Sequence, residues 1–212
     1  MKFVIPARKG SKGLPGKNRI LLDYTIKQVP EEHRGDVIIT TDDRHIVDKL
    51  KDTKFKILKR NSELSGDKAS IQDVLKDVIE KYNIPDNETI VMLYLTYPQR
   101  SWQEIINAIE FFYKNDANSL LCRKEVKIHP YLCLYEAGEN RGKQIVEHNM
   151  YRRQDYPPCF ELSHYVCIFK ASEIKFLNKN MYNDFTVFFP IEDRIDVDIE
   201  RDLKAFHDKN NC

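Results

Sequence analysis

Short apolar runs and amphipathic segments alternate along the first 125 residues of the chain. The run KFVIPA (2–7) is almost continuously apolar, which is typical of a strand buried on both faces of a parallel sheet. Residues 21–29, LLDYTIKQV, then carry apolar side chains at helical spacing. The same alternation predicts these further elements: strand 36–43, helix 45–52, strand 55–60, helix 70–82, strand 89–98, helix 101–115 and strand 119–124. This order predicts an α/β fold with a mostly parallel sheet covered by helices.

Polar residues mark where two of these helices begin. Ser70 and Ser101 stand at the first positions of the predicted helices 70–82 and 101–115, where a side-chain oxygen can cap the free backbone N–H groups. Between the two helices, TIVMLYLTYP (89–98) is the most apolar strand of the chain. We therefore expect this strand at the centre of the sheet.

Residues 126–160 lose this regular alternation. They contain strand-like pieces, a Gly-containing turn and a Pro-Pro pair, which we interpret as an excursion, a hairpin that packs on a partner subunit. Strand character returns at 165–174 and 185–191, and 200–208 closes the chain as a helix. Because the sequence has neither an internal repeat nor a low-complexity tract, we expect residues 1–212 to form a single domain.

Composition narrows the classes of function. A chain of 212 residues can bury most of its apolar surface in one domain. Its 34 basic and 33 acidic residues nearly cancel, so the overall charge predicts no nucleic acid and no membrane as a partner. The five cysteines form no CxxC pair, and no apolar stretch reaches the length of a signal segment or a membrane span. These features favour a reducing, cytoplasmic setting.

The segment ARKGSKGLPGKN (7–18) concentrates positive charge on a glycine-rich loop directly after the first strand. Ligands bind beyond the carboxyl ends of the strands in parallel α/β sheets, so we expect this loop at the functional edge. Glycines let backbone N–H groups converge on an anion, and Arg8, Lys12 and Lys17 add charge-assisted hydrogen bonds. The loop is therefore predicted to hold a di- or triphosphate, with a solvated basic turn as the alternative.

Spacing excludes two familiar phosphate-binding loops. A Walker A loop has four residues between its glycines and a Ser or Thr after its Lys, whereas five residues separate Gly10 from Gly16 and Asn18 follows Lys17. The dinucleotide fingerprint G-x-G-x-x-G is also absent from the sequence.

The segment RIDVDIERDL (194–203) alternates acidic and apolar residues. On a strand, Asp196 and Asp198 would project from one face while the apolar residues between them pack on the other. Mg²⁺ is usually bound by one or two carboxylates together with phosphate oxygens and waters. The pair is therefore a candidate Mg²⁺ site, and an exposed acidic edge strand is the alternative.

Several further residues have both a functional and a structural interpretation. We expect Asp43 to cap the helix after the second strand, and we leave the role of Asp42 open. The segment KRNSELSGDKAS (59–70) could wrap a base or ribose, but a plain loop before a helix explains it nearly as well. His164 lies in an apolar strand, where a satisfied core histidine is the alternative to a binding role.

Together these motifs resemble the acylneuraminate cytidylyltransferases, that is, the CMP-sialic acid synthetases and their relatives that activate nine-carbon acidic sugars. The matching motifs follow in order along nearly the whole chain: IPARKGSKGLPGKN, TTD, KRNSELSGDKAS, TYPQR, KIHP, RQDYPPCF and RIDVDIERDL.

The resemblance implies a three-layer, Rossmann-like nucleotide-diphospho-sugar transferase fold, with a mostly parallel central sheet. It also implies a homodimer in which the protruding segment 126–160 helps to close the partner's sugar site. For CTP, the resemblance implies these residues: Arg8, Gly10, Ser11, Lys12, Lys17, Asn18, Arg60 and Ser70. For Mg²⁺ it implies Asp196 and Asp198, and for the acid group of the sugar it implies Arg153. The implied catalytic residues are Arg8, Lys17 and Asp198.

Departures from the family pattern cluster at the expected sugar site. Tyr94 occupies the usual position of a Gln, and Glu161, Ser163 and His164 lie where relatives have an Arg-Pro-Asn-Gly run before a strand. Because these positions face the sugar in relatives, we expect Tyr94, Ser163 and His164 to contact an altered acceptor.

The leading hypothesis is therefore a Mg²⁺-dependent enzyme that transfers CMP from CTP to the hydroxyl of an acidic sugar, sialic acid or a related nonulosonic acid, and releases pyrophosphate. One alternative is nucleotidyl transfer to another sugar or to a sugar phosphate. The other is a degenerate relative that binds a nucleotide or a partner protein without catalysis.

Overall fold

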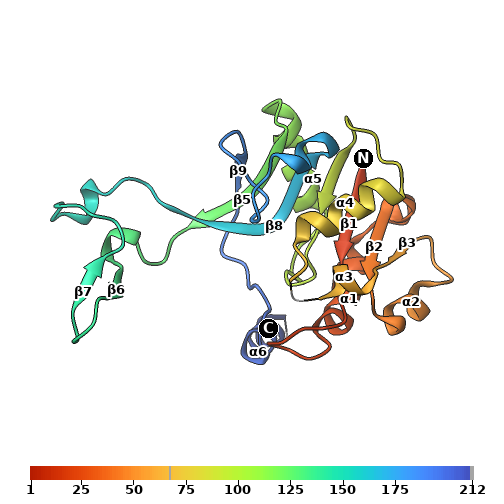
Figure 1. The fold of residues 1–212 in the computed structure, drawn as a ribbon, viewed down its shortest axis with the longest axis horizontal. Coiled ribbons are helices and arrows are strands. Elements are labelled where there is room, and N and C mark those ends of the chain that lie inside the picture. Colours follow the sequence, from red (N-terminus) through yellow and green to blue (C-terminus); the bar gives the residue numbers. More distant parts are fainter. Residues whose placement is uncertain (67, 211–212) are drawn as a thin grey trace.

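A computed structural model describes residues 1–66 and 68–210. Within this part of the chain, seven strands form one sheet in the order β3-β2-β1-β4-β8-β5-β9, and β6 and β7 form a separate hairpin (Figure 1). The strands are β1 (Lys2–Pro6), β2 (Val37–Thr41), β3 (Lys56–Lys59), β4 (Thr89–Met92), β5 (Ser119–Glu125), β6 (Leu134–Glu136), β7 (Gly142–Gln144), β8 (Phe160–Lys170) and β9 (Val187–Pro190).

Helices connect most of the strands. The α-helices are α1 (Lys17–Gln28), α2 (Arg44–Leu50), α3 (Ser62–Ser65), α4 (Ile71–Lys81), α5 (Trp102–Lys114) and α6 (Glu200–Asn210). The 3-10 helices are η1 (Glu31–Asp36), η2 (Pro130–Leu132), η3 (Arg153–Asp155) and η4 (Ala171–Lys175). None of these helices combines the length and the apolar character that crossing a membrane requires.

The sheet is mostly parallel, as the sequence predicts. Strand β1 pairs in parallel with β2 and β4, β2 pairs in parallel with β3, and β5 pairs in parallel with β9. Only β8, among the seven strands described, runs antiparallel to both of its neighbours, β4 and β5. The expected central position of β4 is confirmed.

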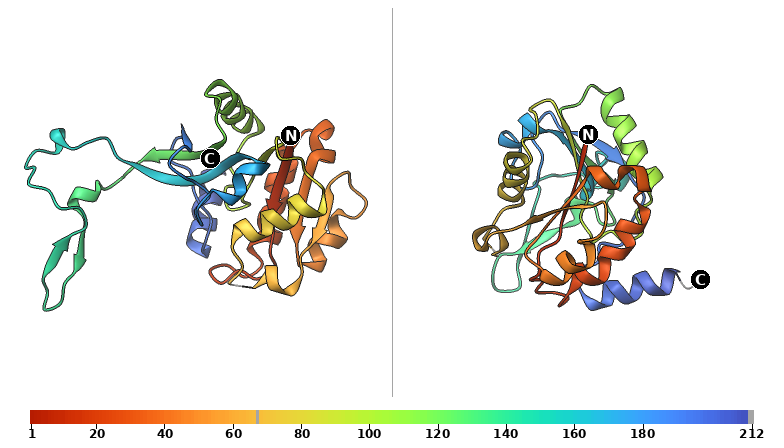
Figure 2. Two further views of the ribbon diagram at one scale, coloured as in Figure 1. Left: turned by 45° about the horizontal axis from the view of Figure 1, so that its top comes forward. Right: turned by 90° about the vertical axis from the view of Figure 1, so that its right-hand side faces the viewer.

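Side-chain alternation along β1 divides the core into two layers. Phe3 and Ile5 face the cluster to which α1, α2 and α5 contribute, whereas Val4 faces the cluster covered by α4 and η4. All three side chains are at most 1% exposed. The sheet is therefore covered on both faces, which explains why its strands are almost continuously apolar and confirms the predicted three-layer α/β fold (Figure 2).

The segment between β5 and β8 leaves the sheet as an arm, which extends far from the rest of the molecule (Figure 1). The predicted hairpin is present as β6 and β7, which pair antiparallel. Four rings, those of His129, Tyr131, His148 and Tyr156, pack together at the base of this hairpin, with His148 stacked on Tyr131 at 4.3 Å between centroids. The arm therefore has a small core of its own.

Two sequence expectations are wrong in their secondary structure. Strand β4 ends at Met92, although the apolar pattern predicted a strand to residue 98. The segment RIDVDIERDL (194–203), whose alternation was interpreted as a strand, joins no sheet, and α6 begins within it at Glu200. Its Val197 N–H donates to Thr96 O at 2.8 Å, and this bond does not continue into a ladder. Both segments instead leave the sheet and line a pocket.

Arg100 holds the chain where it departs from β4. Its guanidinium donates to the carbonyl oxygen of Tyr94 at 2.7 Å and to the carbonyl oxygen of Tyr165 in β8. The side chain is 3% exposed, and burial lowers the pKa of Arg100 to about 10, so the group remains charged at neutral pH. Arg100 thus ties the segment that follows β4 to the neighbouring strand.

Replacing this buried guanidinium should destabilise the fold. Arg100→Met leaves two buried carbonyl groups without a donor, which is expected to cost about 2 kcal/mol. For a chain of this size, that cost lowers Tm by about 4–8 °C in a thermal unfolding experiment. The control is Arg141→Met, because Arg141 pairs with Glu139 on the exposed arm and such pairs contribute little. Equal Tm values for the two variants would contradict the role given to Arg100.

Candidate functional site

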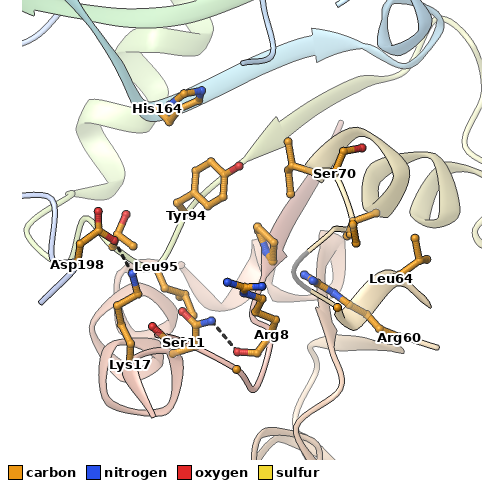
Figure 3. A pocket seen from close by; sticks show the side chains of 18 of the residues that line it. Arg8, Ser11, Lys17, Arg60, Leu64, Ser70, Tyr94, Leu95, His164 and Asp198 are labelled. Carbon is orange, nitrogen blue, oxygen red and sulfur yellow. Dashed lines mark hydrogen bonds and ion pairs between the residues drawn. The ribbon is translucent and has the colours of Figure 1, made fainter. Parts of the chain in front are cut away.

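A pocket of about 450 Å³ lies beyond the carboxyl ends of β1 and β4 (Figure 3). Five parts of the chain contribute to it: the loop after β1, the segment between β3 and α4, the segment after β4, the strand β8 and the segment before α6. This location agrees with the rule that ligands of α/β proteins bind at the carboxyl edge of the sheet. The pocket brings together the basic loop and the acidic segment, which lie far apart in the sequence.

Hydrogen bonds from neighbouring elements fix the shape of the basic loop. Asp42, whose role the sequence left open, accepts the backbone N–H of Lys9 at 2.7 Å. Asn18 donates from Nδ2 to the carbonyl oxygen of Arg8 at 2.8 Å. Gly16 enters α1 with φ +72°, a left-handed conformation that favours glycine. The loop is therefore held in one conformation, with Arg8, Gly10, Ser11, Lys17 and Asn18 lining the pocket.

The predicted cap at Asp43 is confirmed, and it stabilises the neighbouring helix rather than the pocket. Its carboxylate accepts the backbone N–H of His45 and forms an ion pair with Arg19 at 2.6 Å. The hydrogen bond from Arg19 lowers the pKa of Asp43. Asp42 and Asp43, adjacent in sequence, thus support the loop and the helix respectively.

Lys17 and Asp198 connect the two halves of the pocket. Lys17 Nζ donates to Asp198 Oδ1 at 2.6 Å, across 181 positions of sequence. The Lys17 side chain is mostly buried, at 12% exposed, whereas that of Asp198 is 66% exposed. The basic loop and the acidic segment are thus joined directly by this ion pair.

Gly13 permits this close approach of the loop to the acidic segment. A Cβ atom at position 13 would lie 2.5 Å from the carbonyl oxygen of Asp198 and 3.2 Å from Ile199 Cγ2. The nearer of these atoms belongs to the backbone and cannot rotate away. Glycine is therefore required here by packing rather than by backbone conformation.

The two aspartates of the predicted Mg²⁺ site lie in the same pocket, as the sequence proposed. Both are exposed, while Val197 between them is fully buried, so the predicted alternation holds without a strand. Tyr97 OH donates to Asp196 Oδ2 at 2.9 Å. Among the described residues, no cluster of three or more His, Cys, Asp or Glu is placed to hold a metal ion. A carboxylate pair fits a Mg²⁺ ion that takes its remaining ligands from phosphate oxygens and waters.

The wall between β3 and α4 contains Arg60. Its Nε donates to Thr40 Oγ1 at 3.1 Å, and its Nη2 is buried without a hydrogen-bond partner in the described part of the chain. Burial lowers the pKa of Arg60 to about 10, although the nearby carboxylate of Asp42 acts to raise it.

Ser70 also lines this wall, and it confirms the predicted helix cap. Its hydroxyl donates to Asp73 Oδ2, and its oxygen accepts the backbone N–H of Asp73.

The opposite wall is aromatic. Tyr94 and His164 both line the pocket, and their rings meet edge to face with centroids 5.8 Å apart. His164 Nε2 lies 2.9 Å from the carbonyl oxygen of Asn180, so the ring is satisfied by the backbone while its face remains in the pocket wall. Burial raises the pKa of Tyr94, which keeps its hydroxyl protonated at neutral pH.

Three predicted site residues do not line this pocket: Lys12, Arg153 and Ser163. Lys12 is exposed on the basic loop. Ser163 is 4% exposed, behind the wall, because β8 points its side chain toward Tyr97. Arg153 lies in η3 on the arm, away from the pocket of its own chain. Sequence reasoning missed Tyr97, which lies in the segment after β4 and lines the pocket; its polar hydroxyl near the end of the apolar run 89–98 was the signal.

Comparison with known proteins places this fold among the nucleotidyltransferases. The structure of CMP:2-keto-3-deoxy-manno-octonic acid synthetase complexed with CTP aligns with a TM-score of 0.71, at 13% sequence identity, over 99% of this chain and 98% of that one. A family model described as cytidylyltransferase matches residues 2–208, and the chain belongs to this family.

Curated relatives agree with this assignment. N-acylneuraminate cytidylyltransferase of Streptococcus agalactiae serotype V is 32% identical over 167 residues, which are 74% of this chain and 40% of that protein. CMP-N,N'-diacetyllegionaminic acid synthase of Campylobacter jejuni is 28% identical over 213 residues, which are 94% of this chain and 90% of that protein. The match thus spans 40% of the length of the streptococcal relative and nearly all of the other.

A methyl group at position 13 should separate the loop from the acidic segment. We expect Gly13→Ala to lower the free energy of unfolding by about 1–3 kcal/mol, because overpacking against backbone forces the two segments apart. Denaturant titration measures this change. Gly35→Ala is the control, since nothing lies within 4 Å of its added Cβ atom. Equal stability of the Gly13 variant and the wild type would show that the contact is not restrictive.

Proposed function

We propose that this chain catalyses transfer of CMP from CTP to the hydroxyl of an acidic sugar of the nonulosonic class, with Mg²⁺ as the cofactor. The acceptor oxygen attacks the α-phosphorus, the bond from that phosphorus to the bridging oxygen breaks, and pyrophosphate leaves. The observation that carries the proposal is the ion pair between Lys17 and Asp198, which joins a phosphate-binding loop to a candidate metal site in one pocket. Family membership and the named substrates of the relatives support it.

Each half of the pocket has a separate task in this proposal. Arg8, Lys17 and the backbone of the Gly10–Ser11 turn would hold the triphosphate, and their positive charge would offset the negative charge that develops on the leaving group. Arg60, with its unpartnered Nη2, would contact the nucleotide. Asp196 and Asp198 would hold Mg²⁺, which neutralises phosphate charge when bound. Because no covalent nucleophile is needed, positioning and charge neutralisation supply the rate enhancement.

The aromatic wall would hold the acceptor. Tyr94 and His164 present ring faces and edges to the pocket, so this wall suits the apolar face of a sugar ring or an N-acyl methyl group better than an additional charged group. The acid group of the sugar would be bound by Arg153 of a partner subunit, since Arg153 of the same chain lies on the projecting arm.

Pyrophosphate release tests the reaction directly. The protein is incubated with CTP, UTP, GTP or ATP, each with and without Mg²⁺, and with N-acetylneuraminic or N,N'-diacetyllegionaminic acid as acceptor. We expect release that requires CTP, Mg²⁺ and one of these acidic sugars. CTP-dependent thermal stabilisation without release from any acceptor would instead favour a non-catalytic nucleotide-binding relative.

Removing either member of the ion pair should abolish most turnover without unfolding the protein. We expect Lys17→Ala and Asp198→Ala each to lower kcat about 100-fold or more, because each removes an electrostatic group from the reacting centre. Stability should change by about 1 kcal/mol or less, since an ion pair with an exposed partner contributes little. Steady-state kinetics and thermal unfolding measure both effects. Unchanged kcat in either folded variant would contradict the assigned roles.

We further propose that the protein is a homodimer held by the arm. Large apolar side chains are exposed along it, including Ile128, Leu134, Ile145 and Tyr151, the last at 97%. Large exposed apolar side chains gathered on one projecting segment are typical of an interaction site. The exchange of two arms would bring Arg153 of each chain to the pocket of the other.

A complementation experiment tests this arrangement. Arg153→Ala and Asp198→Ala are expected to be inactive as separate homodimers. In a heterodimer of the two variants, one of the two pockets combines an intact Asp198 with an intact Arg153 from the partner, so purified heterodimers should regain roughly half of the wild-type activity. An absence of recovered activity in purified heterodimers would show that Arg153 does not act across the interface.

We also propose a cytoplasmic location. Cys122, Cys133, Cys159 and Cys167 are free thiols, and reducing compartments maintain cysteines in this state. Fractionation of cells that express the protein, followed by thiol labelling, should recover it in the cytoplasm with these thiols reduced. Recovery from an oxidising compartment would contradict this assignment.

A further inference from the structure

Tyr97 connects the interior of the sheet to the candidate metal site. Its hydroxyl donates to Asp196 Oδ2 at 2.9 Å. The same hydroxyl oxygen accepts from Ser163 Oγ at 3.4 Å, and Ser163 Oγ in turn accepts the backbone N–H of Tyr165 at 3.3 Å. A chain of hydrogen bonds therefore runs from the backbone of β8 through two hydroxyl groups to a carboxylate of the pocket.

The direction of this chain is fixed by its two ends. A backbone N–H can only donate, and an ionised carboxylate can only accept, so each hydroxyl passes its hydrogen toward Asp196. Tyr97 is 6% exposed and its ring packs edge to face on Tyr165. The geometry therefore leaves the Tyr97 hydroxyl as the donor to Asp196.

Other contacts already hold the backbone that carries Asp196. Val197 N–H donates to Thr96 O at 2.8 Å, and Ile195 N–H donates to Gln99 Oε1 at 3.2 Å. Arg194 pairs with Glu104 at 2.7 Å. Burial alone would raise the pKa of Glu104, but hydrogen bonds from Ser101, Tyr165 and Arg194 hold it below its ordinary value. The phenol is therefore not needed to place the segment, and its specific effect is on the orientation of the carboxylate.

We infer that Tyr97, supported by Ser163, is a positioning residue that orients the Asp196 carboxylate for Mg²⁺. The hydrogen bond engages Oδ2, and Oδ1 makes no hydrogen bond that the described residues reveal. The hydrogen bond thus occupies one carboxylate oxygen and leaves the other available as a single ligand, which suits an ion with strict octahedral geometry. This role also gives Ser163 a function different from the sugar contact that the sequence predicted. The inference rests on the proposed Mg²⁺-dependent reaction.

The test compares Tyr97→Phe, which removes only the hydroxyl, with the wild type. Two quantities are measured: the Mg²⁺ concentration that gives half-maximal pyrophosphate release, and the Mg²⁺-dependent part of the thermal stabilisation by CTP. Loss of a group that orients a metal ligand weakens metal binding about 10–100-fold. The Mg²⁺ concentration for half-maximal pyrophosphate release should therefore rise at least about tenfold. The Mg²⁺ concentration that gives half of the Mg²⁺-dependent stabilisation should rise by the same factor. Stabilisation by CTP without Mg²⁺ should stay unchanged, because Tyr97 does not hold the triphosphate in this account.

Two further variants make the result specific. Tyr113→Phe removes a hydroxyl that donates to Thr89 Oγ1 at 2.9 Å, outside the pocket lining, and should leave the Mg²⁺ dependence unchanged. Ser163→Ala removes the supporting donor and should shift the Mg²⁺ dependence in the same direction as Tyr97→Phe, by a smaller factor. It provides a second measurement if Tyr97→Phe does not fold.

The outcomes separate this inference from the proposed function. If the wild type depends on Mg²⁺ but both Tyr97→Phe and Ser163→Ala share its half-saturation value, the positioning role is wrong and the proposed reaction stands. If CTP stabilises the wild type equally with and without Mg²⁺ and pyrophosphate release needs no metal, the metal assignment itself fails, and this inference fails with it.

Discussion

The contact between Lys17 and Asp198 is the constraint on which the arrangement of the pocket depends. It joins the loop after the first strand to the segment before the last helix, and the missing side chain of Gly13 allows these segments to approach. Its energetic contribution is small, because a pair with one exposed partner contributes about 1 kcal/mol or less. Its importance is therefore geometric: it places a cation of the basic loop beside a candidate metal ligand.

The layers of the fold bring these distant segments together. Parallel pairing of β1 with β2 and β4 directs the carboxyl ends of these strands to one edge, where their loops form a common pocket. Strand β8, inserted antiparallel beside β4, contributes His164 to the same pocket and Ser163 to the layer behind it. One strand thus lines the proposed acceptor wall and supports the proposed metal site.

Local patterns were enough to predict much of this structure. The apolar run at β1, the helix caps at Ser70 and Ser101, and the cap at Asp43 depend on neighbouring residues, and all are present. Charge and spacing also pointed to Arg8, Lys17 and the two aspartates, whereas Ser11 and Asn18 came from the family resemblance; all of them line the pocket.

Failures occurred where tertiary contacts override local pattern. The segment after Met92 has the apolar character of a strand, but Arg100 binds the carbonyl of Tyr94 and directs the chain toward the pocket. The acidic segment alternates as a strand does, yet it docks through isolated hydrogen bonds and forms no ladder. Ser163 lies in β8, which begins before the strand expected at 165–174, and it faces Tyr97 because its orientation depends on the register of β8 with its neighbours. None of these long-range contacts is visible in a local sequence window.

Family membership and the geometry of the pocket together support the proposed reaction. In the proposed reaction, the basic loop and the carboxylate pair would hold the nucleotide and the metal, and Tyr94 and His164 would face the acceptor. A crystal structure with CTP and Mn²⁺, with manganese located by anomalous scattering, tests the central claim most directly. The account predicts manganese bound by Asp196 and Asp198, with the triphosphate against Arg8 and Lys17. A metal ion bound away from these carboxylates, or a nucleotide outside this pocket, would contradict it.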